Sequence, residues 1–195
     1  MQPTCSTQTT CKTKTLSILR VAAVALLALI APQAAQAADI TFLGETYAQA
    51  HSDIRTTGNS VVEYVRPTET IGSWSKLAGG HRFPDNSETP KEAVLAFAAV
   101  LKKIDPANRY AIIENPQTGE AIIDFLVSKE GSDTVEFNIY KYARHPSGNG
   151  LIALQFAQRF ELGKVNADEL KAVRSKAIDE AAKFDMSLII PVIVN

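Results

Sequence analysis

Cysteine is scarce in this sequence, occurring only as Cys5 and Cys11 near the N-terminus. If the N-terminal segment is removed on export, the remaining chain has no thiol. A chain without thiols excludes a disulfide framework, a thiolate metal ligand and a nucleophilic cysteine. We therefore expect stability to come from an ordinary apolar core.

Acidic residues are absent from residues 1–38. An apolar run over residues 21–30 follows three basic residues: Lys12, Lys14 and Arg20. Small residues at Ala35 and Ala37 then match the positions that a signal peptidase reads. The pattern predicts a cleaved signal peptide over residues 1–37 and a single α+β domain over residues 38–195.

Long apolar runs are missing as well. A membrane-spanning helix needs about 20 apolar residues, and residues 21–30 are too few. No cysteine follows this run where a lipid could be attached. We expect no stable membrane anchor after cleavage, and a periplasmic or secreted location in a Gram-negative bacterium.

Excess positive charge is absent too. The leader holds three of the 20 basic residues and none of the 21 acidic ones, so the remaining domain has a net charge of −4. Phosphate backbones are bound mainly by lysine and arginine. We expect no nucleic-acid partner.

Histidine is rare, and His51, His81 and His145 are far apart in the chain. None has a second ligand at the spacing of a zinc site on one helix, so we expect all three on the surface or in loops. Ser147 near His145 lies in a glycine-rich turn rather than in a nucleophile elbow. We predict no catalytic residues, no metal and no cofactor.

Two segments have the start signals of helices. Thr89, Pro90 and Glu92 form a capping box with proline at the first helical position, which predicts a helix to about Ile104. Asn166 caps a second apolar stripe that ends near Phe184.

Period-two alternation predicts strands between these helices. Four runs are joined by turn-forming residues and form an antiparallel meander: 110–114, 121–127, 135–142 and 151–160. Earlier in the chain, Ile40 and Phe42 begin a possible strand and residues 61–65 form another. Trp74 and Leu77 suggest a short helical segment. Residues 188–194 suggest an edge strand or an extended strap that lies over the core.

A meander with a helix before it and another after it predicts an α+β fold in which helices flank an antiparallel sheet, as an α/β/α sandwich.

The segment from Glu63 to Thr70, followed by Trp74 and Phe83, resembles a pattern of small exported bacterial proteins with the PsbP-like fold. The resemblance covers residues 61–184 and implies an α/β/α sandwich. Members of this fold include a photosystem II extrinsic subunit and a nuclear-import factor, and they act mainly as binding and assembly factors. The pattern departs at Gly79-Gly80-His81, which interrupts the helix expected after the tryptophan. The resemblance carries no catalytic residues onto this chain.

One face of the meander mixes aromatic and polar side chains, as binding surfaces do. The candidate binding residues are Asn138, Tyr140, Tyr142, Gln155, Arg159 and Trp74. In the alternative interpretation, a helix or the C-terminal strap covers this face, and Trp74 belongs to the core.

These observations predict an exported, non-enzymatic binding or accessory protein of the cell envelope, whose partner is another protein or an envelope component. Two alternatives stay open. One is a periplasmic inhibitor or immunity protein. The other is a hydrolase that uses two carboxylates, chosen from Glu63, Glu69, Glu114, Asp124 and Glu136.

Overall fold

The computed structural model describes residues 39–128 and 131–190. Eight strands form one antiparallel sheet in the order β1-β2-β3-β4-β8-β7-β6-β5. The first four strands are β1 (Ile40–Phe42), β2 (Glu45–Ile54), β3 (Ser60–Val65) and β4 (Lys76–Phe83). The last four are β5 (Tyr110–Glu114), β6 (Ala121–Ser128), β7 (Thr134–Arg144) and β8 (Leu151–Glu161).

Two α-helices and one short 3-10 helix complete the described part: α1 (Pro90–Ile104), α2 (Ala167–Lys183) and η1 (Met186–Leu188). Both α-helices begin where the sequence predicts. The Thr89 side chain accepts a hydrogen bond from the Glu92 backbone N–H, and the Glu92 side chain accepts one from the Thr89 backbone N–H. The Asn166 side chain caps α2 by accepting a hydrogen bond from the Glu169 backbone N–H. Neither helix is long and apolar enough to cross a bilayer.

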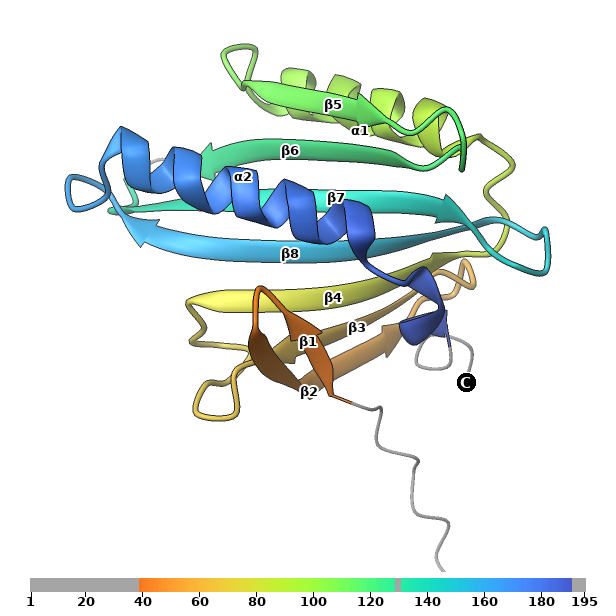
Figure 1. Cartoon of the computed structure of the whole chain (residues 1–195), viewed down its shortest axis with the longest axis horizontal. Coiled ribbons are helices and arrows are strands. Elements are labelled where there is room, and N and C mark those ends of the chain that lie inside the picture. Colours follow the sequence, from red (N-terminus) through yellow and green to blue (C-terminus); the bar gives the residue numbers. More distant parts are fainter. Residues whose placement is uncertain (1–38, 129–130, 191–195) are drawn as a thin grey trace, which may run out of the picture. The chain divides into compact units, whose positions relative to one another are not determined.

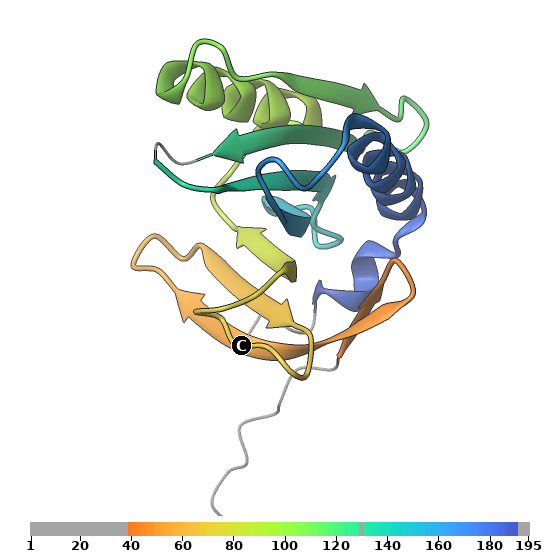
Figure 2. The same cartoon turned by 90° about the vertical axis from the view of Figure 1, so that its left-hand side faces the viewer.

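The expected α/β/α sandwich is wrong. The described part of the protein is largely β: its sheet curls into a half-barrel, and two α-helices accompany it there (Figures 1 and 2). Helix α1 packs on β5, β6 and β7, and α2 packs on β6 and β7. The helices therefore lie against one half of the sheet, while β1 to β4 extend the sheet beyond them.

Side-chain alternation divides the sheet into two faces, each with its own core. The α2 face buries the larger cluster, with Phe42, Tyr64, Phe137, Leu154 and Phe156 among its members. The α1 face buries a second cluster around the inner side of α1. Both faces of the helical half are thus apolar, which explains why β6 has an almost unbroken apolar sequence.

The four strands of the meander agree with the sequence prediction. The short helix expected around Trp74 and Leu77 is wrong, because Leu77 lies in strand β4 and pairs with Val65 and Ala157. The predicted C-terminal strand or strap, residues 188–194, begins instead with Leu188 in η1, and its last four residues lie outside the described residues. The predicted signal peptide, residues 1–37, lies outside them too.

Candidate functional site

The structure brings all six candidate binding residues onto the α1 face. Strands β7 and β8 are neighbours whose register places Tyr140 opposite Gln155 and Glu136 opposite Arg159. Because alternate residues share a face, the even residues of β7 lie beside the odd residues of β8. Trp74, just before β4, joins them through its contact with Arg159.

Hydrogen bonds connect the polar members of this set into one chain across three strands. Asn138 Nδ2 donates to Glu136 Oε1 at 3.0 Å, and Gln155 Nε2 donates to Asn138 Oδ1 at 3.3 Å. Gln155 Oε1 lies 2.9 Å from Nε2 of His81 on β4. The side chains thus satisfy one another's polar groups, which allows Asn138 to be buried.

The tyrosine end of the set lies under helix α1. The Tyr140 ring is 5.3 Å from that of Phe97 on α1 and 6.2 Å from that of Tyr142. Burial raises the pKa of both hydroxyls, to about 12 for Tyr142. A helix therefore covers this end, as the alternative interpretation expected. Asn138 is buried as well, at 3% exposed. The partly exposed residues Gln155, Arg159 and Trp74 stay a predicted binding surface.

His81 corrects one expectation, because it lies in β4 and is partly buried rather than in a loop. Burial lowers the pKa of its imidazole to about 4, a shift that the hydrogen bond to Gln155 opposes. The side chain is therefore neutral near pH 7, and Nε2 donates to Gln155. His51 is exposed on β2 and His145 lies in the β7–β8 turn.

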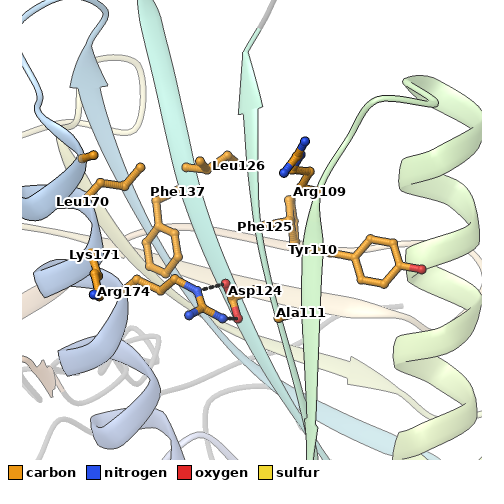
Figure 3. Close-up of a pocket in the computed structure, with 11 residues that line it drawn as sticks. Arg109, Tyr110, Ala111, Asp124, Phe125, Leu126, Phe137, Leu170, Lys171 and Arg174 are labelled. Carbon is orange, nitrogen blue, oxygen red and sulfur yellow. Dashed lines mark hydrogen bonds and ion pairs between the residues drawn. The ribbon is translucent and has the colours of Figure 1, made fainter.

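A second feature, which the sequence reasoning missed, is a groove of about 380 Å³ between α2 and the edge of the sheet (Figure 3). We call it the β5–α2 groove. It is lined by Arg109, Tyr110, Ala111, Asp124, Phe125, Leu126, Phe137, Ala167, Leu170, Lys171 and Arg174.

The floor of the groove is apolar. Phe137 comes from β7, Leu126 from β6 and Leu170 from the first turn of α2 (Figure 3). Helix α2 packs on β6 and β7, so the α2 face of β5 has no helix above it. Ala111 contributes only a methyl group there, which leaves the hollow open.

One buried acid lies beneath the groove. Asp124 is 4% exposed, and both of its oxygens accept hydrogen bonds from Arg174, from Nε at 2.6 Å and from Nη2 at 2.8 Å. This bidentate pair ties α2 to β6 and holds the pKa of Arg174 above its ordinary value. Asp124 therefore compensates the charge of Arg174.

Two further cations stand at the rim. Arg109 just precedes β5 and Lys171 lies on α2, and both are exposed. Neither forms an ion pair with another residue of the described ranges. The groove thus joins an apolar floor to a rim with two positive charges that no described residue pairs with.

Four of the five carboxylates considered for a hydrolase are ion-paired. Besides Asp124, Glu69 pairs with Arg66, Glu114 with Lys91, and Glu136 with Arg159. The hydrogen bond from Arg66 is the largest cause that lowers the pKa of Glu69 to about 2. Within residues 39–128 and 131–190, no three histidine, cysteine or acidic side chains lie close enough together to hold a metal ion.

Comparison with curated proteins finds no match. A model of an uncharacterised protein family matches residues 33–186, which includes every described strand and both α-helices. This match does not address the resemblance to PsbP-like proteins, which stays a prediction. Because the matched region is well over half of the sequence, the chain belongs to this uncharacterised family.

Proposed function

We propose that this chain is an exported, non-enzymatic binding protein of the bacterial envelope, and that the β5–α2 groove binds an amphipathic anion. Such a ligand has one acidic head group and an apolar chain. The observation that carries the proposal is the apolar floor beneath two cations, Arg109 and Lys171, that have no ion-pair partner within residues 39–128 and 131–190. Export is supported by the charge pattern of residues 1–37.

The floor favours an apolar chain. Phe137, Leu126 and Leu170 offer carbon surface on three elements, and covering such surface contributes about 25 cal/mol per Å². A volume of about 380 Å³ accommodates a small ligand rather than a folded domain. The walls are β6, β7 and α2, which are held together by the Asp124–Arg174 pair.

The rim favours an acidic head group. Figure 3 shows Arg109 on the strand side of the groove and Lys171 beside Arg174 on α2. A carboxylate or phosphate above the floor therefore has positive charge on both sides. Hydrogen bonds between ionised partners are stronger than neutral ones, so the two cations select an anion.

The same residues support binding rather than catalysis. Among the described residues that line the groove, Asp124 is the one acid, and Arg174 donates hydrogen bonds to both of its oxygens. A general base needs a carboxylate or imidazole free to accept a proton, and the lining residues include no histidine.

Isothermal titration calorimetry with dodecanoate tests this proposal. We expect dodecanoate to bind and dodecyltrimethylammonium, which has the same chain with a positive head, to bind at least about tenfold more weakly. Removing both rim cations in Arg109→Ala/Lys171→Ala should weaken dodecanoate binding about tenfold or more. Filling the floor in Ala111→Phe should weaken binding of both probes.

The matched control is Lys103→Ala/Lys176→Ala, which removes two exposed lysines that do not line the groove. Lys176 is on the opposite side of α2 from Lys171, because five residues turn a helix by about 500°. This variant should bind dodecanoate as the parent protein does. Absence of dodecanoate binding by the parent, or equal weakening in the control, would refute the proposal.

A further inference from the structure

Exposed apolar side chains gather at one end of the sheet. Nine large hydrophobic side chains are exposed in the described part. Two of them, Tyr110 and Ile113, lie on β5, and Leu95 lies on the flank of α1 that also carries Lys91 and Lys102. Helix α1 lies next to β5 (Figure 1). An apolar concentration of this kind marks an interaction surface more often than scattered single residues do.

Strand β5 is also an unprotected sheet edge. Its sequence, Tyr110–Glu114, contains no proline and only one charged residue, at its end, and its register with β6 has no bulge. Natural edge strands usually contain a proline, charged side chains or a bulge, or are very short, and these features prevent pairing with another chain. The opposite edge, β1, has only three residues. The long, apolar edge is therefore β5.

The backbone of β5 shows which groups another strand would meet. Asn115 donates to the Glu120 carbonyl at 2.9 Å across the hairpin. Because hydrogen-bonded and non-hydrogen-bonded pairs alternate along an antiparallel ladder, Ala111 and Ile113 bond toward β6. The backbone groups of Tyr110, Ile112 and Glu114 then point away from the sheet, on the side where no described strand pairs with β5.

We propose that two copies of this protein pair through β5, antiparallel and two-fold symmetric about Ile112, and that each copy closes the open side of the other's β5–α2 groove. The pairing itself is independent of the proposed ligand. Only its consequence for the groove rests on the proposed function.

Charge complementarity supports a second copy as the occupant. A two-fold axis at Ile112 places Glu114 of one copy opposite Tyr110 of the other. Within each copy, Lys102 Nζ lies 6.0 Å from the centre of the Tyr110 ring. The carboxylate of Glu114, which already pairs with Lys91 at 3.2 Å in its own copy, therefore also comes close to the ammonium of Lys102 in the second copy, and the symmetry repeats this attraction at both ends of the strand pair.

The length of β5 selects this register. Centred on Ile112, residues 110–114 overlap completely, and all their outward backbone groups find partners. A shift toward the C-terminus brings Pro116, which has no N–H, into the pairing. A shift toward the N-terminus moves Glu114 away from Lys102 of the second copy, so Glu114 keeps its pair with Lys91 of its own copy but gains no cation across the dimer.

The same register completes the groove. Ala111 lines the groove at the edge strand, and the residue opposite it in the second copy is Ile113. Ile113 is 39% exposed, and it has the same parity as Ala111, so it lies on the same face of the continuous sheet. Its side chain would add an apolar wall beyond β5, where a single copy has none.

Sedimentation velocity of the exported protein, from about 1 to about 100 μM, tests the pairing. We expect a reversible dimer. Ile112→Pro should give a monomer, because it removes an N–H that points outward and leaves the bonds between β5 and β6 in place. Circular dichroism and thermal unfolding must show that this variant is folded.

A matched pair of substitutions does not alter the backbone. Ile113→Lys puts a charge at the pairing strand and should weaken the dimer about tenfold or more. Ile104→Lys makes the same change at a more exposed position on α1, 77% exposed. Ile104 lies on the opposite flank of α1 from Lys91 and Lys102, whose ammonium groups contact Glu114 and Tyr110 of β5. This control should remain dimeric.

A charge exchange tests the register. Glu114→Lys should weaken the dimer, and Glu114→Lys/Lys102→Glu should restore it. A parent protein that is monomeric throughout the concentration range, or a dimer that persists in both Ile112→Pro and Ile113→Lys, would refute the pairing. Calorimetry with dodecanoate is a separate measurement. A monomer that binds dodecanoate refutes only the dimer, and a dimer that does not bind it refutes only the proposed ligand.

Discussion

The guanidinium of Arg159 lies 3.5 Å from the centre of the Trp74 ring. Its Nε also donates to Glu136 Oε2 at 3.1 Å, and its Nη1 donates to the Trp74 carbonyl at 3.4 Å. Trp74 packs in turn on Val65 and Leu77. One arginine thus fastens the β3–β4 connection to β8 and β7.

This contact predicts a measurable coupling between the two side chains. Arg159→Gln and Trp74→Leu should each destabilise the fold by about 1 kcal/mol, since a partly exposed cation–π contact contributes about that much. The double variant should lose less free energy of unfolding than the two single variants lose together, and the difference, which is the coupling energy, should be about 0.5–1 kcal/mol. Urea unfolding followed by circular dichroism measures all members of the cycle, and strict additivity would contradict the prediction.

The Asp124–Arg174 pair should contribute more to the free energy of unfolding than the contact between Arg159 and Trp74. Arg174→Ala leaves the carboxylate of Asp124 buried without its partner, and we expect a loss of about 3 kcal/mol. Replacing both residues in Asp124→Leu/Arg174→Leu should recover most of that loss, because it leaves no unpaired charge. Urea unfolding followed by Trp74 fluorescence measures these changes. If the free energy of unfolding of Arg174→Ala is within about 0.5 kcal/mol of that of the parent, the prediction is wrong and water reaches Asp124.

Gly150 has no room for a side chain. A methyl group built there would lie 2.0 Å from the Phe83 carbonyl oxygen, and its φ of +74° already disfavours other residues. Gly150→Ala should therefore cost more than about 3 kcal/mol. Gly148→Ala is the control, because Gly148 has a similar φ of +81° and no atom within 4 Å. It should cost about 1 kcal/mol, measured by thermal unfolding.

His81 predicts a loss of stability in mild acid. Its pKa is about 4 when folded and 6.5 ordinarily, so the unfolded chain binds a proton that the folded chain does not accept. The free energy of unfolding therefore keeps its full value above pH 6.5 and decreases as the pH falls from 6.5 toward 4. We expect a loss of up to about 3 kcal/mol over that range.

His81→Gln, which retains a donor toward Gln155, should flatten the pH profile of urea unfolding. His51→Gln, at an exposed position, should leave the profile as it is in the parent. A parent profile no steeper than that of His81→Gln would contradict the assigned role of His81.

Local signals predicted the helices and the meander well. Both helices follow from caps and apolar stripes that are complete within a few residues. The meander follows from alternation between turns. These patterns are strong because each element buries a face against the core, and the chain must show that burial in its spacing.

Strands β2 and β4 were missed for different reasons. Residues of β2 are mostly exposed on both faces, so no apolar alternation marks the strand. In β4, Gly79 suggests a break. The structure shows that a Cβ at Gly79 would lie 3.4 Å from Gln155 Oε1 and 3.5 Å from His81 Nε2. These distances are ordinary van der Waals contacts, so the backbone at Gly79 follows a regular strand path and the glycine marks no break in β4.

Missing these strands led to the wrong layer arrangement. With only the meander in view, two helices suffice to cover the sheet, which is why a sandwich was expected. The β5–α2 groove was missed because it forms where α2 packs on β6 and β7, and α2 follows these strands only after the whole of β8. One signal was present: Asp124 is a charge within the apolar run of β6, and a buried acid needs a cation such as Arg174.

The pairing of β4 with β8 has a consequence for how the chain reaches this structure. Strands β1 to β4 form one local meander and β5 to β8 another, since each strand in either set pairs with its neighbours in sequence. Only the β4–β8 ladder, which joins residues 76–83 to residues 151–158, crosses between them. Closing so long a loop costs conformational entropy before the hydrogen bonds of the ladder can stabilise the closed chain. The two meanders can form early and independently, whereas the continuous half-barrel exists only after this one seam has closed.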